Sequence, residues 1–152
     1  MKGQGLIESV LALGFISIVL SSIAIILISS LSNADRSKNQ AVATQYAQEG
    51  IEMLRKIRNS NHQGFKSYNG TYCFGKDAND AAGLGSPSSC NVPNIDSYIR
   101  SVKIEQTPGC GLNVAKITVK VAWIDGKCLN GSYCHSSELI SCLSTFNPIQ
   151  SP

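Results

Sequence analysis

The sequence predicts an α+β protein: a long N-terminal helix, about residues 5–58, packs by its second half on a small antiparallel sheet of about three strands. Residues 9–31 form a run of 23 residues without a charge. Beyond this run a helical repeat of apolar residues continues without a proline, and the last third of the chain alternates apolar and polar residues as strands do. Six cysteines, all after the apolar run, predict loops that are stapled by disulfides.

Residues 4–31, the first half of the helix, are predicted to cross a membrane. At 1.5 Å per residue the uncharged run is roughly 35 Å long, and the hydrocarbon core of a bilayer is about 30 Å thick. Glu8 directly precedes this run. A carboxylate inside a bilayer costs roughly 3 kcal/mol or more, so ionisable residues in such segments usually serve a function. The function of the protein should therefore explain Glu8.

The cysteines indicate that the domain after the helix is exported, because disulfides form in oxidising compartments. Only Lys2 precedes the apolar run, whereas Arg36 and Lys38 follow it, so the positive-inside rule alone does not favour this orientation. The predicted orientation therefore rests on the short N-terminal flank and on the cysteines. We expect a single-pass protein of the cytoplasmic (inner) membrane with its N-terminus in the cytoplasm.

The segment Gly3-Gln4-Gly5-Leu6-Ile7-Glu8-Ser9 stands directly before the apolar run. It resembles the processing site of type IV prepilins and type II secretion pseudopilins. In that family a short basic leader ends in glycine, the fifth mature residue is glutamate, and about twenty apolar residues follow. The family usually has Phe or Met where this chain has Gln4, and Thr or Ser where it has Gly5.

The resemblance implies a set of roles for these residues. Residues 1–3 would be a leader, cleaved between Gly3 and Gln4 by a prepilin peptidase that also N-methylates Gln4. Glu8 would pair with the free α-amine of Gln4 of a neighbouring subunit in a filament. Small residues would let neighbouring helices approach closely, although ordinary membrane-helix composition explains them equally well: Ala12, Gly14, Ser17, Ser21, Ser22 and Ala24.

Residues 32–59 are predicted to form the amphipathic half of the helix. Their apolar positions recur at steps of three or four and should cover the sheet: Ala43, Ala47, Gly50, Ile51, Leu54 and Ile57. Glycine within a helix costs up to about 1 kcal/mol against alanine, so Gly50 predicts close packing of a strand at that point. Residues 47–59 also resemble the post-membrane helix of small minor pilins. The helix should end near residues 59–61, where polar side chains favour a turn.

Residues 60–152 are predicted to form the exported domain, which begins with a variable loop over residues 60–97. The loop is rich in Gly, Ser, Asn and Pro. A Cys73–Cys90 disulfide would staple it and stabilise the fold by about 3 kcal/mol in the chain-entropy model. Asp77, Asn79 and Asp80 were weighed as calcium ligands, but the loop lacks a full pattern of oxygen ligands, and a solvated turn is preferred.

The predicted strands cover residues 97–105, 113–123 and 136–144, with turns at 107–111 and from 125 onward. The second strand should turn one face toward the helix: Ala115, Ile117, Val119, Val121 and Trp123. An antiparallel meander brings Cys110 close to Cys142, and Cys128 and Cys134 flank the loop before the third strand. We therefore predict Cys110–Cys142 and Cys128–Cys134 disulfides, although six cysteines allow many pairings.

Zinc is the alternative role for the C-terminal cysteines. Cys128, Cys134, His135 and Cys142 are the residue types that zinc prefers, but such a site needs a reducing compartment and tighter spacing. No metal or other cofactor is therefore expected. His62 and His135, the only histidines, lie in polar loop sequence and are expected to be exposed.

The sequence shows no catalytic constellation, and no basic run is longer than a pair, so neither an enzyme nor a specific nucleic-acid site is predicted. The resemblance implies a structural subunit, a minor pilin or pseudopilin, of a type IV pilus or type II secretion-like filament. Its partners would be other pilin subunits, the prepilin peptidase, a membrane assembly platform and, before assembly, membrane lipid. The alternative is a membrane-anchored extracellular binding domain that does not polymerise. A third hypothesis, a disulfide-rich enzyme on an anchor, lacks a sequence signal.

Overall fold

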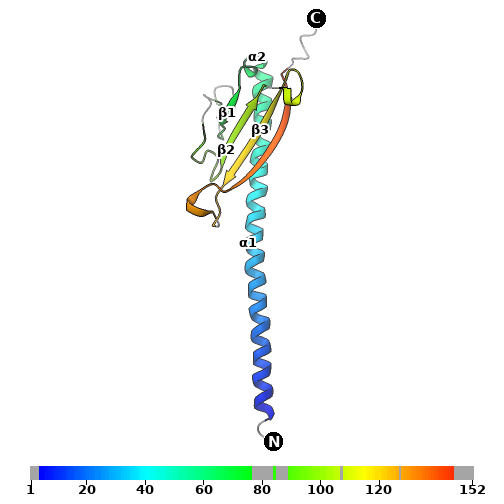
Figure 1. Cartoon of the computed structure of the whole chain (residues 1–152), viewed down its shortest axis with the longest axis vertical. Helices are drawn as coiled ribbons and strands as arrows, with labels where there is room; N and C mark the ends of the chain where they lie inside the picture. The colour runs from blue at the N-terminus through cyan, green and yellow to red at the C-terminus, as the bar shows by residue number, and fades with distance from the viewer. Residues whose placement is uncertain (1–3, 77–83, 85–88, 107, 127, 146–152) are drawn as a thin grey trace. The chain divides into compact units, whose positions relative to one another are not determined.

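A computed structural model describes residues 4–76, 84, 89–106, 108–126 and 128–145. Its elements in chain order, with 3-10 helices marked η, are α1 (Gln4–Ser60), α2 (His62–Phe65), β1 (Gly70–Cys73), β2 (Ile99–Glu105), η2 (Pro108–Cys110), β3 (Val114–Trp123), η3 (Leu129–Gly131) and β4 (His135–Ser144) (Figure 1). The chain divides into two compact units, Met1–Lys38 and Asn39–Pro152. Each is described by itself.

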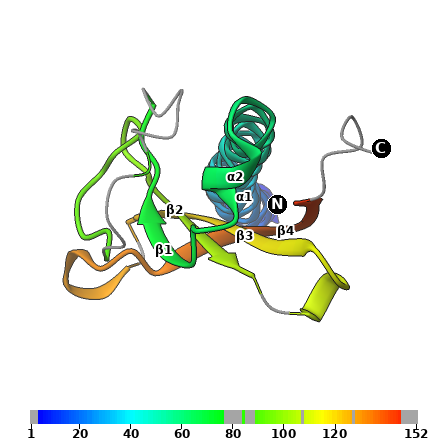
Figure 2. The same cartoon turned by 90° about the horizontal axis from the view of Figure 1, so that it is seen from above.

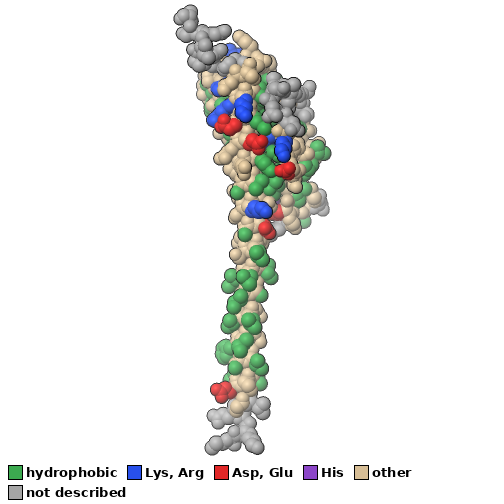
Figure 3. Space-filling view, turned by 180° about the vertical axis from the view of Figure 1, so that it is seen from behind, with side chains coloured by type: hydrophobic (Ala, Val, Ile, Leu, Met, Phe, Trp, Pro, Cys, Tyr) green, Lys and Arg blue, Asp and Glu red, His purple; other side chains and the backbone are tan. Residues whose placement is uncertain are grey.

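The first unit is the N-terminal part of α1. Its large apolar side chains are exposed, and it belongs to the one helix of the described chain that is long and apolar enough to cross a membrane. Figure 3 shows hydrophobic side chains along this part of the helix on the face in view. Several serine hydroxyls donate to the carbonyl four residues earlier, as in the 2.7 Å bond from Ser17 to Leu13. The same bond is made by Ser9, Ser21 and Ser22.

The second unit contains a sheet of four antiparallel strands in the order β1-β2-β3-β4. Three of them lie where the sequence predicts strands, with ends within two residues of the prediction. The fourth, β1, lies in the segment that we predicted to be loop. It is four residues long, too short for its alternation to stand out, yet Tyr72 on β1 is buried opposite Val102 of β2.

Residues 39–60 of α1 cover one face of this sheet (Figure 2). The predicted helix face is buried against the predicted strand face, and together they form the core of the unit. Gly50 lies at the closest approach: a Cβ at this position would stand 3.1 Å from Val119 Cγ1 and 3.3 Å from Arg100 Cδ. The expected close packing of a strand against Gly50 is therefore present. The helix ends at Ser60, and Asn61 caps α2 by accepting a 2.8 Å hydrogen bond from the Gly64 amide.

Three disulfides close the loops of the second unit. They join Cys73 to Cys90, Cys110 to Cys142, and Cys128 to Cys134. These are the three pairs expected from the sequence. The first ties the end of β1 to the segment before β2, the second ties η2 to β4, and the third closes the loop between β3 and β4.

Candidate functional sites

The N-terminal segment of α1 contains Gln4 and Glu8, two of the residues for which the resemblance to prepilins implies a role in processing or assembly. Gly3 lies outside the described residues, and Gln4 is the first residue of α1. Glu8 follows Gln4 by about one helical turn, and it is exposed. No Lys or Arg occurs between positions 4 and 35, so this stretch offers Glu8 no cationic side chain. The carboxylate therefore stands at the start of an apolar surface without a basic side chain nearby on its own helix.

Arg100 on β2 is a buried charge that the sequence analysis missed. Its side chain is fully buried and donates to three carbonyl oxygens: Nε to Phe74 at 2.8 Å, Nη1 to Tyr46 at 3.0 Å and Nη2 to Gly75 at 2.7 Å. The guanidinium also lies over the Phe74 ring, 5.2 Å from its centroid. Burial lowers the pKa of Arg100, and the Glu49 carboxylate, 3.5 Å away, opposes this shift. Arg100 thereby fastens the chain after β1 to α1.

A signal for Arg100 is present in the sequence. Within β2, Arg100 is two and four residues before Val102 and Ile104, which both face the core, and strand side chains alternate faces. Strict alternation therefore places Arg100 on the inner face. Its charge conceals this place in the pattern, because a charged residue rarely occupies a core position.

A pair of tyrosines lies where α1 meets the segment before β2. Tyr46 donates a short hydrogen bond to the Asp96 carboxylate, and the Tyr46 and Tyr98 rings meet edge to face at 5.4 Å. The hydrogen bond to Asp96, followed by burial, raises the pKa of Tyr46 to about 12. Asp96 has a positive φ of 48°. These contacts fix the segment that leads into β2.

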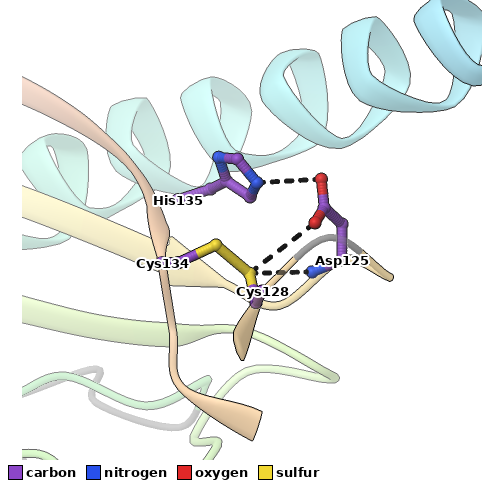
Figure 4. Close-up of side chains that lie close together, drawn as sticks. All are labelled: Asp125, Cys128, Cys134 and His135. Carbon is purple, nitrogen blue, oxygen red and sulfur yellow. Dashed lines mark hydrogen bonds and ion pairs between the residues drawn. A yellow bond between two sulfur atoms is a disulfide. The ribbon is translucent and has the colours of Figure 1, made fainter. Parts of the chain in front are cut away.

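The loop between β3 and β4 gathers Asp125, Cys128, Cys134 and His135 (Figure 4). His135 Nε2 lies 2.8 Å from Asp125 Oδ2, and the side chains are 21% and 19% exposed. The His135 ring also stacks on Trp123, with centroids 5.6 Å apart. The expectation that His135 is exposed is therefore wrong, because its place at the start of β4, opposite Trp123 of β3, holds the ring against that side chain.

The four residues of the alternative zinc set, Cys128, Cys134, His135 and Cys142, do not lie together in the structure. Cys142 is bonded to Cys110, whereas Asp125 joins Cys128, Cys134 and His135. The turn after β3 places Asp125 beside these residues. The sequence analysis missed Asp125 because its spacing from the cysteines matches no known ligand pattern. The calcium candidates Asp77, Asn79 and Asp80, and the side chain of His62, lie outside the described part of the chain.

The solvent side of the sheet carries a shallow groove with charges of both signs. Lys103 pairs with Glu105 at 2.8 Å, and Lys120 with Glu138 at 3.2 Å. The hydrogen bond from Lys103 lowers the pKa of Glu105, and burial opposes this shift. The groove is lined further by Thr71, Ser101, Lys116, Thr118 and Ile140. Paired surface charges of this kind are typical of a solvated sheet face.

Comparison with protein-family models, with curated proteins and with solved structures finds no match for this chain. The arguments below therefore rest on its sequence and its structure.

Proposed function

We propose that this chain is a structural subunit, a minor pilin or pseudopilin, of a type IV pilus or a type II secretion-like filament. The observation that carries the proposal is the exposed apolar surface of α1 between Ile7 and Leu31. Such a surface needs lipid or other apolar partners. A bilayer can cover the apolar surface and leaves Glu8 at its hydrated edge, whereas a bundle of identical helices can supply both an apolar surface and a cation at a fixed position.

The proposed cation is the α-amine of Gln4 on a neighbouring subunit, which becomes free when the prepilin peptidase cuts after Gly3. Leaving one partner of a desolvated ion pair alone costs about 3–5 kcal/mol, so Glu8 would fix the axial register between subunits as well as stabilise them. Four serines of this stretch, Ser9, Ser17, Ser21 and Ser22, suit this packing, because each hydroxyl donates within the helix and keeps this partner when lipid or a second helix covers it.

The proposed sequence of events begins in the cytoplasmic membrane, where residues 4–31 would span the bilayer with the N-terminus in the cytoplasm. The disulfide-bonded unit would fold on the outside, where the three cystines are stable. After processing and N-methylation of Gln4, an assembly platform would move the helix from lipid into the filament core. The sheet and loops would then face outward.

A charge-removing variant tests the proposal in a host that has a prepilin peptidase and a filament system. Intact-mass measurement of wild type should show a mature chain that begins at N-methylated Gln4. Glu8→Gln keeps the size of the side chain and removes its charge. We expect this variant to enter the membrane normally, whereas its amount in purified filaments should fall at least about tenfold, the factor that corresponds to 1.4 kcal/mol.

The matched control is Glu52→Gln, which removes an exposed carboxylate from the second half of the same helix, where it pairs with Arg55. This control should be incorporated like wild type. A wild-type chain that still begins at Met1, or normal incorporation of Glu8→Gln, would refute the proposal. Both results together would favour a membrane-anchored binding domain that does not polymerise.

A further inference from the structure

The loop between β3 and β4 places four metal-ligating side chains around one point. One ligand atom each from Asp125, Cys128, Cys134 and His135 lies within 4.8 Å of the other three. Figure 4 shows the His135 ring and the Asp125 carboxylate beside the Cys128–Cys134 disulfide. In the described part of the chain this is the one group of three or more such residues. One carboxylate, two sulfurs and one imidazole are a donor set that zinc accepts.

The surrounding structure holds this set in place. Trp123 and His135 are direct partners in the β3–β4 ladder, and their stacked rings fix the imidazole. The Cys128 amide donates to the Asp125 carbonyl at 3.1 Å, and the Asp125 amide donates to Cys128 Sγ at 3.4 Å. The Cα atoms of Cys128 and Cys134 are 5.6 Å apart. The turn at Asp125 and Cys128 and the start of β4 therefore hold both cysteines on one side of the loop while their sulfurs are bonded.

His135 Nε2 has a second property that suits a ligand. It is buried and makes no hydrogen bond of acceptable geometry to a described residue, although Asp125 Oδ2 is 2.8 Å away. A buried ring nitrogen that lacks a well-aligned hydrogen bond gains free energy when a partner binds its lone pair. Zinc prefers the lone pair of a neutral imidazole.

We propose that reduction of the Cys128–Cys134 disulfide opens a zinc site made of the two thiolates, one Asp125 oxygen and one His135 nitrogen. While the disulfide is intact the sulfurs are not thiolates, and the thiolate is the form that binds zinc. The loop is thus a metal site that the redox state of one disulfide opens and closes. This inference does not depend on assembly of the chain into a filament.

The chemistry balances with a monothiol of the glutathione class as reductant. Two reductant thiols give one oxidised disulfide of the reductant and two protein thiols at Cys128 and Cys134. Zinc then displaces both thiol protons to water and leaves the imidazole neutral. Two thiolates and one carboxylate around a divalent cation give the site one net negative charge. Zinc itself undergoes no redox change.

The test measures whether zinc stabilises the reduced form of this pair alone. The full chain in detergent micelles is equilibrated in a glutathione redox buffer, with and without free zinc fixed by a metal buffer. Thiols are then alkylated in the presence of a chelator and located by peptide mass spectrometry. At free zinc of about 100 times the dissociation constant, the ratio of reduced to oxidised Cys128–Cys134 should rise about 100-fold by linkage. The Cys73–Cys90 and Cys110–Cys142 ratios should not change.

Two ligand variants and one control complete the test. Asp125→Asn and His135→Gln should each reduce the zinc-dependent rise at least about tenfold, since loss of even an indirect partner of a metal site costs about that much. Glu138→Gln, which alters an exposed carboxylate on β4, should keep the full rise. The two other disulfides report folding in each sample, because an unfolded variant would expose all three to the buffer.

Three results would overturn the inference. They are an unchanged Cys128–Cys134 ratio in the presence of zinc, an equal shift of all three pairs, and a wild-type response in both ligand variants. The last result would show that zinc is held by the two thiols without the residues that the loop brings beside them.

Discussion

At the scale of single residues, the side chain of Arg100 joins segments that are far apart in the sequence. Its guanidinium satisfies a carbonyl of α1, at Tyr46, and two carbonyls after β1, at Phe74 and Gly75. Its counterion, Glu49, is 42% exposed. A fully buried cation is tolerated only with such partners, because removal from water costs several kcal/mol. The Tyr46 carbonyl also belongs to the hydrogen-bond ladder of α1, whereas the Phe74 and Gly75 carbonyls lie outside a helix or strand and receive their hydrogen bonds from Arg100.

Replacing this residue tests that dependence. Arg100→Met removes the donors from the buried carbonyl of Phe74 and the half-buried carbonyl of Gly75, so we expect the free energy of unfolding to fall by about 3 kcal/mol. Urea unfolding of the full chain in detergent, followed by the fluorescence of the single tryptophan, Trp123, measures this change. Arg55→Met is the control, because the Arg55–Glu52 pair is exposed and should contribute less than about 1 kcal/mol. Equal stability of the two variants would contradict the role given to Arg100.

The hydrogen bond between Tyr46 and Asp96 leads to a prediction about pH. The raised pKa of Tyr46, about 12 against an ordinary 10.0, means that the fold favours the neutral phenol. The contribution of this pair to stability is therefore complete below pH 10 and is lost as the pH rises from 10 through 12. Ultraviolet titration of the five tyrosines should show one that ionises near pH 12.

Asp96→Asn should move that ionisation back toward the ordinary pKa of tyrosine, because the amide accepts a weaker hydrogen bond and has no charge. Asparagine also tolerates the positive φ of this position, so the backbone need not change. Asp35→Asn, an exposed change on α1, is the control and should leave the titration unaltered. An unchanged high-pH ionisation in Asp96→Asn would show that burial rather than Asp96 raises the pKa of Tyr46.

At the scale of elements, Gly50 sets how closely α1 approaches the sheet. Gly50→Ala gains helix propensity, up to about 1 kcal/mol. The new methyl group would meet Val119 Cγ1 at 3.1 Å and Arg100 Cδ at 3.3 Å, and neither neighbour can move freely, because both are fully buried and Arg100 is held by hydrogen bonds. We expect the clash to outweigh the propensity and to lower the free energy of unfolding by about 1 kcal/mol.

The same urea unfolding of the full chain measures this effect. Gly14→Ala is the matched control, since nothing lies within 4 Å of a Cβ at that helix position. It should leave the tryptophan transition unchanged. A more stable Gly50→Ala would mean that the helix moves away from the sheet at little cost.

The elements with a clear period could be predicted from the sequence. The apolar stripe from Ala43 to Ile57 and the alternation from Ala115 to Trp123 each specify one buried face, and the structure buries both. The antiparallel order then brings Cys110 near Cys142. β1 was missed because four residues carry almost no periodic signal. Arg100 was missed because its charge concealed its place in the alternation of β2.

The candidate sites could be predicted less completely. Gln4 and Glu8 stand out through a local motif, and their role stays a prediction because it depends on a second subunit. The cluster at the β3–β4 loop depends instead on tertiary structure. Asp125 reaches Cys128 and His135 through a turn and a strand register that a spacing rule does not encode. The sequence suggested Cys142 as a ligand, and the fold assigns that sulfur to Cys110.

At the scale of the whole molecule, the two units are stabilised by different interactions. The second unit has a buried core and three disulfides. The apolar stretch in the first unit is exposed among the residues that the structure describes. In detergent or lipid its stability comes from intrahelical hydrogen bonds, because an unfolded backbone would leave its polar groups without partners in an apolar medium.

This difference predicts two separate unfolding signals for the full chain in detergent micelles. On heating, the fluorescence of Trp123 should report loss of the second unit, whereas far-ultraviolet circular dichroism should keep the share that belongs to the micelle-embedded part of α1. Leu54→Ala, which leaves a cavity in the core, should lower the free energy of unfolding in the tryptophan transition by about 2–5 kcal/mol. It should not reduce the residual helical signal. Ile16→Ala, in the exposed apolar stretch, should shift neither signal by a comparable amount. Loss of all helical signal together with the tryptophan transition would show that the two units unfold as one.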